Sequence, residues 1–416
     1  MTKVRDRARL AVIVGTRPEI IKVASVIHEL QRRGIDFTLI HSGQHYDEML
    51  SGIFLRQLGL PHAHYDLGVG SGSQSYQTAK IMLQLEKTLE IAGANLTVVQ
   101  GDTNTALAGA ITSRKIGISV AHIEAGLRSY DARMPEEYNR KIADHLSQYL
   151  FAPTEQAKVT LNREACDGIV YVTGNTIIDA CLAYGSMASN SSTILGTLPF
   201  KRFALSTTHR AENVENPDVL KGFAELFCKS PIPVVYPLHP RTEARFRSAG
   251  LMKKLRASKN VHITSPLGYL DFLMLLMKCE FVLTDSGGIQ EEITAPNIRK
   301  KAFVLRDTTE RPEAVESGYA EVVGTNAIRI LARLNRFLEE GWAPKEPSPY
   351  GDGHAGKRIV DILEHKLNRP KGLYKAQSSR FGRLRSDTDY YRKRRCRQMR
   401  PTTYQRTQYR FRPNGG

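Results

Sequence analysis

The feature that most constrains the fold is a repeated alternation of short apolar runs with helix-length amphipathic segments. Ten runs have the length and composition of buried strands: Leu10–Val14, Phe37–Ile40, Leu96–Val99, Ser119–Ile123, Ile169–Val172, Phe203–Leu205, Val234–Leu238, Val261–Ile263, Phe281–Leu283 and Ala302–Leu305. Helical patterns lie between them, for example over Glu19–Arg33, Gln74–Ile91, Glu136–Gln148 and Asn326–Glu340. Continuous apolar strands joined by helices are typical of parallel sheets covered on both faces. We therefore predict an α/β fold.

Ten strands are too many for one small sheet, and 416 residues suffice for two domains with separate cores. The alternation stops at Met187–Pro199, a stretch rich in Ser, Gly and other small residues. The predicted organisation is an N-terminal Rossmann-like domain at 1–186, a linker at 187–199, a C-terminal Rossmann-like domain at 200–355, a helix at 356–366 that packs back on the first domain, and a tail at 367–416.

The tail holds most of the chain's net charge of +17, because it has fifteen Lys/Arg and two acids. This leaves about +4 for the other 366 residues. Aromatic residues lie among the arginines, so one interpretation is a nucleic-acid-binding arm. The other is a disordered extension or a sequence artefact. We expect the second, since a charge block without periodicity is typical of disorder.

Other features limit the class of protein. No apolar run approaches the roughly 18 residues of a membrane-spanning helix, so no membrane partner is expected. The apolar run near the N-terminus is short and leads directly into GTRPE, which favours a first strand over a signal peptide. The cysteines have neither CxxC spacing nor neighbouring histidines, which predicts reduced thiols in a cytoplasmic protein and no zinc site: Cys166, Cys181, Cys228, Cys279 and Cys396.

Polar motifs follow the predicted strands at their carboxyl ends, where open parallel sheets bind ligands. The first half supplies GTRPEIIK, HSGQHY, QGDTNT and HIEAGLRS, and the second half supplies STTHRAEN, PLHPRT and TDSGGIQEE. This arrangement predicts a cleft lined by both domains.

The GTRPEIIK motif has the elements of a phosphate clamp. Gly15 suits a tight strand-to-helix turn, Pro18 suits a first helical turn, and Arg17 lies at the helix N-terminus with Lys22 one turn further. The alternative is an ordinary surface Arg/Lys pair. No GxGxxG follows the strand, so NAD is not indicated, and Gly68–Ser73 follows no convincing strand and is interpreted as a flexible loop.

The TDSGGIQEE motif predicts a second anion site. Ser286 ends a strand, and Gly287 and Gly288 let the backbone approach a ligand where a helix opens. Glu292, about one turn on, could accept hydrogen bonds from ribose hydroxyls, and Arg311 supplies another cation. The alternative is simple turn chemistry.

Three acids and a histidine are candidate catalytic groups: Asp102, Glu124, Glu136 and His209. Carboxylates in a cleft lose solvent, and their raised pKa makes them useful acids or bases. Each acid alone could instead be a helix cap or an ion-pair partner. Two further acids are expected to form structural ion pairs with nearby arginines: Glu137 and Asp144, with Arg140 and Arg128.

Taken together, the motifs closely resemble those of the non-hydrolysing UDP-N-acetylglucosamine 2-epimerases, in order, from about Leu10 to Leu363. They are GTRPEIIK, GDTNT, HIEAGLRS, MPEEYNR, TGNTIID, THRAEN, HPRT, DSGGIQEE and RDTTERPEAVESG. The resemblance implies a GT-B-like pair of Rossmann domains with the active site in the interdomain cleft. It also implies conversion of UDP-GlcNAc to UDP-ManNAc for cell-surface polysaccharide, a homodimer, and no NAD or metal cofactor.

The family's mechanism eliminates UDP to give 2-acetamidoglucal and then adds UDP back. Elimination needs a base at sugar C2 and stabilisation of the departing diphosphate. By resemblance, the catalytic positions are Asp102, Glu124, Glu136 and His209. The UDP-binding positions are Arg17, Lys22, Phe272, Ser286, Gly287, Gly288, Glu292 and Arg311.

Many bacterial relatives have a second, activating UDP-GlcNAc site beside the catalytic one. Residues that match parts of it here are Gln44, His45, Gln74, Arg210 and His239. Ser73 stands where some members have arginine, so allosteric activation stays open.

Four alternatives remain at this point. An epimerase of a UDP-sugar acid tends to have a GARPQ-like first loop, unlike GTRPE here. A hydrolysing 2-epimerase would release free ManNAc, and a GT-B glycosyltransferase would not need the three acids. A nucleic-acid-binding protein would act through the tail.

Overall fold

Two parallel sheets organise the chain. The structure is a computed structural model, and it describes residues 10–43 and 54–367. The first sheet has seven strands in the order β3 (Tyr65–Asp66), β2 (Phe37–His41), β1 (Leu10–Val14), β4 (Leu96–Gln100), β5 (Ser119–Ile123), β6 (Tyr149–Ala152) and β7 (Ile169–Val172). The second has six, in the order β10 (Val261–Thr264), β9 (Val234–Pro237), β8 (Ala204–Thr207), β11 (Phe281–Thr284), β12 (Lys301–Val304) and β13 (Ala320–Val322).

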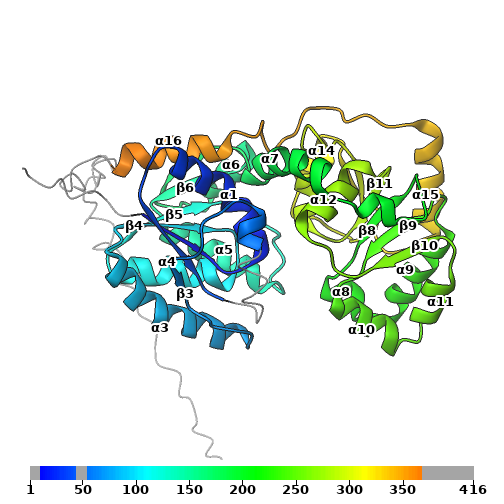
Figure 1. The fold of residues 1–416 in the computed structure, drawn as a ribbon, viewed down its shortest axis with the longest axis horizontal. Helices are drawn as coiled ribbons and strands as arrows, with labels where there is room; N and C mark the ends of the chain where they lie inside the picture. The colour runs from blue at the N-terminus through cyan, green and yellow to red at the C-terminus, as the bar shows by residue number, and fades with distance from the viewer. Residues whose placement is uncertain (1–9, 44–53, 368–416) are drawn as a thin grey trace, which may run out of the picture. The chain divides into compact units, whose positions relative to one another are not determined.

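Helices connect and cover the strands (Figure 1). Those associated with the first sheet are α1 (Arg17–Arg32), α3 (Gln74–Ala92), α4 (Asn104–Lys115), α5 (Pro135–Leu146), α6 (Glu155–Arg163), α7 (Thr176–Ser191) and α16 (Ala355–Leu367). The second half contributes η1 (Ile194–Thr197), α8 (Ala211–Val214), α9 (Pro217–Lys229), α10 (Pro240–Ser248), α11 (Met252–Ala257), α12 (Tyr269–Lys278), α13 (Gly287–Glu292), α14 (Pro312–Glu316) and α15 (Ala327–Glu340).

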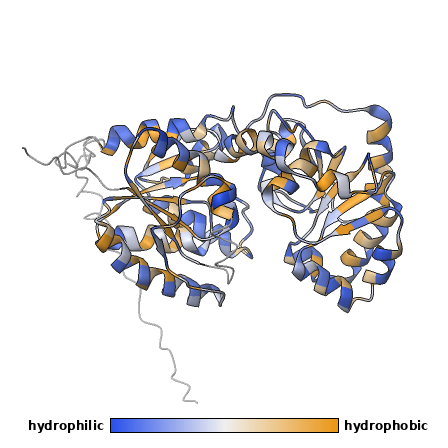
Figure 2. Cartoon of the chain, viewed as in Figure 1, coloured by the Kyte–Doolittle hydropathy of each residue, from blue (hydrophilic) through white to orange (hydrophobic). Residues whose placement is uncertain are grey.

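Alternate strand residues face opposite cores, as expected for sheets covered on both sides. In β1, Val12 and Val14 join the core under α1 and α7, whereas Ala11 and Ile13 join the core under α3 and α4. The strands of both sheets are coloured hydrophobic in Figure 2, while the outer helices are mixed. The pairings within both sheets are parallel, which confirms the predicted α/β class with two Rossmann-like sheets.

The first sheet is joined to the second half by a helical contact. Helix α7 packs against both α1 and α12, and the two sheets belong to one compact unit. Helix α16 packs on α1 and α7, and its Glu364 accepts a 2.8 Å hydrogen bond from Arg33, the residue that caps the C-terminus of α1. The exact domain limits stay a prediction.

The predicted linker is partly wrong, because α7 continues to Ser191 and η1 follows it. The first small residues of the predicted linker belong to helix α7 and do not interrupt it. Ala188 is fully buried, and Ser189 and Ser191 donate hydrogen bonds of 3.0 and 2.8 Å to the carbonyls of Gly185 and Met187. Such bonds to the preceding turn let serine stay in a helix.

Three strands were missed. Strand β6 follows α5 after only two residues, so its apolar residues look like a continuation of the helix, which was predicted to reach Gln148 but ends at Leu146. Strand β3 has two residues and β13 has three. Because β3 directly precedes the glycine-rich segment at 68–73, that segment does lie between a strand and a helix, contrary to the prediction.

The tail at 368–416, with Cys396, lies outside the described residues. Within the part that is described, no helix combines the length and apolarity needed to cross a membrane.

Candidate functional site

The loop after β1 is held close to the loops after its neighbouring strands. A Cβ on Gly15 would lie 2.1 Å from Thr105 Oγ1 and 2.3 Å from Ser42 Oγ. Glycine is therefore required by close packing, whereas its φ is not in the left-handed region, so the predicted reason for this glycine was incomplete. Pro18 lies in the first turn of α1, as predicted.

Glu19 fixes this loop to the loop after β4 and was missed by the sequence analysis. Its buried carboxylate accepts hydrogen bonds from Gly15 N at 3.0 Å and from Thr103 Oγ1 at 2.7 Å. Burial raises the pKa of Glu19 to about 7, although the hydrogen bond from Thr103 acts in the opposite direction. Asp102 precedes Thr103, so Glu19 helps to place a candidate catalytic acid.

A buried cluster of four charges joins the two halves of the chain. Lys22 Nζ lies 2.5 Å from Glu124 Oε2 and 3.0 Å from Glu291 Oε2. Arg311 Nε lies 2.5 Å from Glu291 Oε1, and its Nη2 lies 3.2 Å from Glu124 Oε1. Gln100 adds a 2.5 Å hydrogen bond to Glu124. The cluster therefore balances two cations against two carboxylates.

Glu124 has two properties typical of a functional residue. Its φ is +71°, in the left-handed region that non-glycine residues seldom adopt, and such strain concentrates at functional sites. Burial raises the pKa of Glu124, and Glu291 adds to this effect, while Lys22 and Arg311 oppose it. A buried carboxyl with a raised pKa is suited to accept and return a proton.

Lys22 is buried, so it does not belong to the ordinary surface pair that was the alternative to a phosphate clamp. Burial lowers the pKa of its ammonium, but attraction to Glu124 and Glu291 outweighs burial and raises the pKa above its ordinary value. Lys22 thus neutralises carboxylates. Arg17 is exposed at the start of α1, and its guanidinium carbon lies 5.7 Å from the centroid of the Phe54 ring. Lys22 is thus buried among carboxylates, whereas Arg17 is exposed to solvent.

The other two candidate acids belong to the loop after β4 and to α5. Asp102 forms an ion pair with Arg140 of α5, and its carbonyl accepts a 2.9 Å hydrogen bond from Asn139. Thr103, and not Asp102, caps α4 through a 3.1 Å bond from Ala106 N. Glu136 is half-buried in the first turn of α5.

The acids predicted to be structural are confirmed as such. Glu137 Oε2 lies 3.2 Å from Arg140 Nη1, and Asp144 Oδ2 lies 2.8 Å from Arg128 Nη2. Glu137 also accepts a 2.9 Å hydrogen bond from Ser129 N, so it closes the loop that precedes α5.

Asp285 joins the two motif loops of the second sheet. This fully buried carboxylate accepts hydrogen bonds from His209 N at 3.1 Å, Arg210 N at 3.0 Å and Asn213 Nδ2 at 3.1 Å. It therefore fixes the THRAEN loop beside the DSGG loop. The His209 side chain is exposed, and its ring lies 6.1 Å from that of His239.

The SGG segment opens α13, as predicted. Ser286 is the N-cap residue and its side chain makes no capping hydrogen bond. A Cβ on Gly287 would lie 2.6 Å from Glu310 Oε1, whereas the nearest atom to a Cβ on Gly288 is 3.9 Å away. Close packing thus requires the first glycine, whereas a Cβ on the second would make only an ordinary van der Waals contact.

Glu292 ends α13 and is buried, and its Oε2 atom has no hydrogen-bond partner within the described residues. Burial raises the pKa of Glu292 to about 8, with Lys22 opposing and Glu291 adding to this effect. Buried polar atoms are nearly always paired, so the unpaired carboxyl oxygen keeps Glu292 as a candidate for ligand binding. Phe272 is half-buried against the main hydrophobic core.

Comparison with known proteins identifies the family. The family model described as UDP-N-acetylglucosamine 2-epimerase matches residues 28–364. The UDP-N-acetylglucosamine 2-epimerase of Methanocaldococcus jannaschii is 43% identical over 371 residues, covering 86% of this chain and 99% of the relative. The chain belongs to the UDP-N-acetylglucosamine 2-epimerase family. The resemblance seen in the sequence motifs is thereby confirmed.

Solved structures of this epimerase family have the same fold. The crystal structure of the M. jannaschii enzyme in complex with UDP-GlcNAc and UDP matches with a TM-score of 0.78 at 42% identity, over 86% of this chain and 99% of that one. The Neisseria meningitidis enzyme bound to UDP-GlcNAc also gives 0.78, at 37% identity, over 86% and 100%. A further relative, the UDP-2,3-diacetamido-2,3-dideoxy-D-glucuronate 2-epimerase of Pseudomonas aeruginosa, is 35% identical over 85% of this chain and 99% of its own.

The residues assigned to a second nucleotide site are only partly placed in this epimerase. Gln44 and His45 lie outside the described residues. Gln74 begins α3 and is exposed, and Arg210 Nη2 lies 2.7 Å from Glu310 Oε1. His239 caps α10, and burial lowers its pKa, with His209 and Arg241 contributing. A second site stays a prediction.

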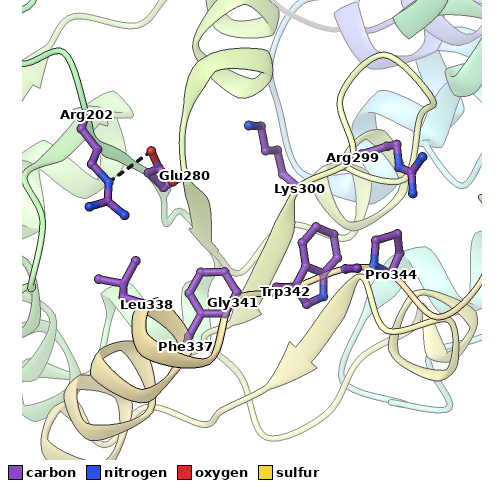
Figure 3. A pocket seen from close by; sticks show the side chains of 10 residues that line it. Arg202, Glu280, Arg299, Lys300, Phe337, Leu338, Gly341, Trp342 and Pro344 are labelled. Carbon is purple, nitrogen blue, oxygen red and sulfur yellow. Dashed lines mark ion pairs between the residues drawn. The ribbon is translucent and has the colours of Figure 1, made fainter.

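A pocket of about 410 Å³ in the epimerase contains none of the predicted site residues. Arg202, Glu280 and Lys300 line it, and each lies one or two residues before a strand, so the pocket lies at the edge of the second sheet opposite the motif loops. Figure 3 shows the Arg202–Glu280 ion pair on one side of it and Trp342 on another. The pocket therefore lies away from the candidate catalytic and UDP-binding residues.

One contact of a cysteine is not visible in the sequence. Cys166, which has no histidine close to it along the chain, has its Sγ 3.6 Å from Nδ1 of His145. The two residues are 21 positions apart, so their spacing gives no signal of the contact. All four cysteines in the described part of the chain are free thiols.

Proposed function

We propose that this chain interconverts UDP-GlcNAc and UDP-ManNAc by eliminating and re-adding UDP. The observation that carries the proposal is the state of Glu124, a strained, buried carboxylate with a raised pKa between a cation of each half, Lys22 and Arg311. Relatives named for this activity, and structures with UDP-GlcNAc and UDP bound, support the substrate.

The reaction is balanced without an external reagent. A carboxylate removes the C2 proton, the C2–H electron pair forms the C1=C2 bond of 2-acetamidoglucal, and the C1–O bond breaks with its electrons going to UDP. A proton is then delivered to the other face of C2, and the diphosphate oxygen attacks C1. Three acids are available for these proton transfers: Asp102, Glu124 and Glu136.

The second half supplies groups for the nucleotide. Exposed His209, together with Arg17 and the backbone of Ser286–Gly288, is proposed to stabilise the diphosphate as negative charge develops on it. Glu292, with its unpaired buried oxygen, is proposed to accept the ribose hydroxyls. Phe272 and Arg311 complete the proposed UDP-binding set, with Lys22 acting through the carboxylates.

A UDP-sugar-acid substrate is the second candidate because one relative carries that name. The GTRPE first loop favours UDP-GlcNAc. A GT-B glycosyltransferase shares the fold but does not need the three acids, and a hydrolysing 2-epimerase has a first loop that differs from GTRPE.

One experiment tests the reaction. The protein is incubated with UDP-GlcNAc in deuterated water, and NMR is expected to show UDP-ManNAc carrying deuterium at C2. Retention of the C2 proton would exclude elimination, free ManNAc would indicate hydrolysis, and absence of turnover with UDP-GlcNAc would favour another sugar. Glu124→Gln should lose most turnover, while Glu155→Gln, whose side chain is 74% exposed on α6, is the control that should keep it.

We further propose that the enzyme is a cytoplasmic homodimer whose product supplies ManNAc units to cell-surface polysaccharide. The family resemblance alone supports these points. Light scattering that gives the mass of a single chain would contradict the dimer.

A further inference from the structure

A cluster of three metal-ligand side chains lies away from the proposed substrate site. His145 near the end of α5 and Glu164 and Cys166 beyond α6 place one ligand atom each within 4.8 Å of one another. His145 is exposed and the other two are half-buried, so an ion has access to all three from solvent. These residues have no role in the proposed reaction and belong to none of the sequence motifs.

The distances fit a tetrahedral zinc site. Zinc lies about 2.3 Å from a thiolate and about 2.0–2.1 Å from a histidine nitrogen, so the two ligand atoms are about 3.6 Å apart at a tetrahedral angle. Here Cys166 Sγ is 3.6 Å from Nδ1 and 4.0 Å from Nε2 of His145. The Nδ1 separation matches this value and the Nε2 separation exceeds it, so the exposed ring must turn for Nε2 to bind the same ion as Sγ.

The neighbouring groups orient two of the ligands. Nδ1 of His145 lies 3.0 Å from the Lys141 carbonyl, which can only accept, so Nδ1 donates and Nε2 keeps the lone pair that a metal needs. Glu164 accepts hydrogen bonds of 2.9 and 2.7 Å from Arg128. Bound histidines and carboxylates in metal sites are commonly held in this way by outer partners.

We propose that His145, Glu164 and Cys166 bind one zinc-like divalent cation and that the cation acts on the loops of Asp102 and Glu124. Thiolate and imidazole ligands favour zinc over magnesium or calcium, which prefer oxygen. Three protein ligands leave the fourth position for water. The binding part is independent of the proposed function, whereas the effect on the loops rests on it.

A chain of buried contacts connects the cluster to those loops. The Arg128 guanidinium that holds Glu164 also lies 2.8 Å from Asp144 Oδ2. Asp144 is 2.7 Å from His122 Nδ1, and His122 Nε2 donates a 2.8 Å hydrogen bond to the Gly101 carbonyl, directly before Asp102.

The Asp144 carboxylate also holds the loop of Glu124. It accepts a 3.2 Å hydrogen bond from Gly126 N, two residues after Glu124. A divalent cation bound to Glu164 repels the Arg128 guanidinium and competes with it for the Glu164 carboxylate. The expected result is weaker support for both loops and a lower turnover.

Binding is tested on the full-length protein with zinc alone, under reducing conditions and without nucleotide. Calorimetry should show a site of one zinc per chain, more than about 100-fold weaker in Cys166→Ser, since even outer-shell substitutions cost about 10- to 100-fold. Cobalt(II) should give a thiolate charge-transfer band that Cys166→Ser lacks. The exposed His145→Ala variant should lose the site without affecting folding, and Cys228→Ser and Cys396→Ser are the controls that should keep it.

Activity is measured on the same variants at equal zinc, so that zinc bound to the nucleotide affects all of them alike. Wild type should lose turnover severalfold more than Cys166→Ser or His145→Ala. Absence of a cysteine-dependent site would overturn the proposal. A site that forms while turnover falls equally in all variants would overturn its action on the loops, and failure of epimerisation itself without zinc would instead concern the proposed function.

Discussion

Removing Lys22 tests whether the four-charge cluster stabilises the contact between the two halves. The side chains of Lys22, Glu124, Glu291 and Arg311 are only 11%, 7%, 0% and 7% exposed. The substitution Lys22→Met keeps the length and apolar stem of the side chain but leaves two buried carboxylates with one guanidinium. The cluster then carries a net charge of −1, and breaking a buried pair in this way costs about 3–5 kcal/mol of unfolding free energy.

A compensating substitution separates charge from packing. Glu291→Gln alone leaves two cations with one carboxylate and is expected to cost a similar amount. The double variant, Lys22→Met with Glu291→Gln, is neutral again, since only Glu124 and Arg311 stay charged. The unfolding free-energy costs of the two substitutions should therefore not add. The double variant should be more stable, by at least about 2 kcal/mol, than the sum of the two single costs predicts.

The assay is urea unfolding followed by far-UV circular dichroism and by fluorescence of Trp342, the chain's single tryptophan. The matched control is Lys158→Met, whose exposed partner Glu155 lies 3.3 Å away, and which should change stability by less than about 1 kcal/mol. Simple addition of the two single costs would refute the idea that the four charges act as one unit. Restored stability should not restore turnover, because Glu124 still lacks Lys22.

Two further predictions concern the loops around the cluster. Gly15→Ala places a Cβ 2.1 Å from Thr105 Oγ1, so it should destabilise the protein by about 1–3 kcal/mol and lower turnover. The control is Gly196→Ala, where a Cβ has open space and neither effect is expected. Thermal unfolding of the two variants measures the difference in stability. Glu292 has a folded pKa of about 8 against an unfolded value near 4.5, so the folded state holds its proton more tightly and stability falls as pH rises through that window. Wild type should lose about 3 kcal/mol more than Glu292→Gln between pH 5.5 and 8.5, at about 1.4 kcal/mol per pKa unit, and equal pH slopes in urea unfolding would contradict this.

The sequence predicts the fold well because strand and helix signals are local. Apolar runs of four or five residues flanked by glycine-containing motifs predict β1, β4 and β5 within one residue of their observed ends. The signal fails where two elements share one apolar pattern, as in β6 after α5, and where small residues continue a helix, as in α7.

Contacts within the candidate site are harder to predict than strands and helices, because the residues that make them are far apart in the sequence. Motif position pointed to Glu124 and Glu292 as candidates, but it gave no sign that Glu291 is paired while Glu292 has an unpaired oxygen. One of the two partners of Glu291 is Lys22, 269 residues away. Glu19 was missed because a buried acid in a helix looks like any first-turn acid until its partner Thr103 is known.

The cluster gives Glu124 a protonation state that depends on both halves of the chain. Lys22 reaches it from α1 and Arg311 from the second half, while Glu291 competes for both cations. In the proposed reaction, a diphosphate near these cations brings more negative charge to the same place. That charge withdraws cationic support from Glu124 and raises its pKa further, because a nearby like charge disfavours ionisation. We expect the carboxylate to become a stronger base when substrate is present. Cations shared between two carboxylates would allow this tuning, which gives one reason for burying four charges where two would balance.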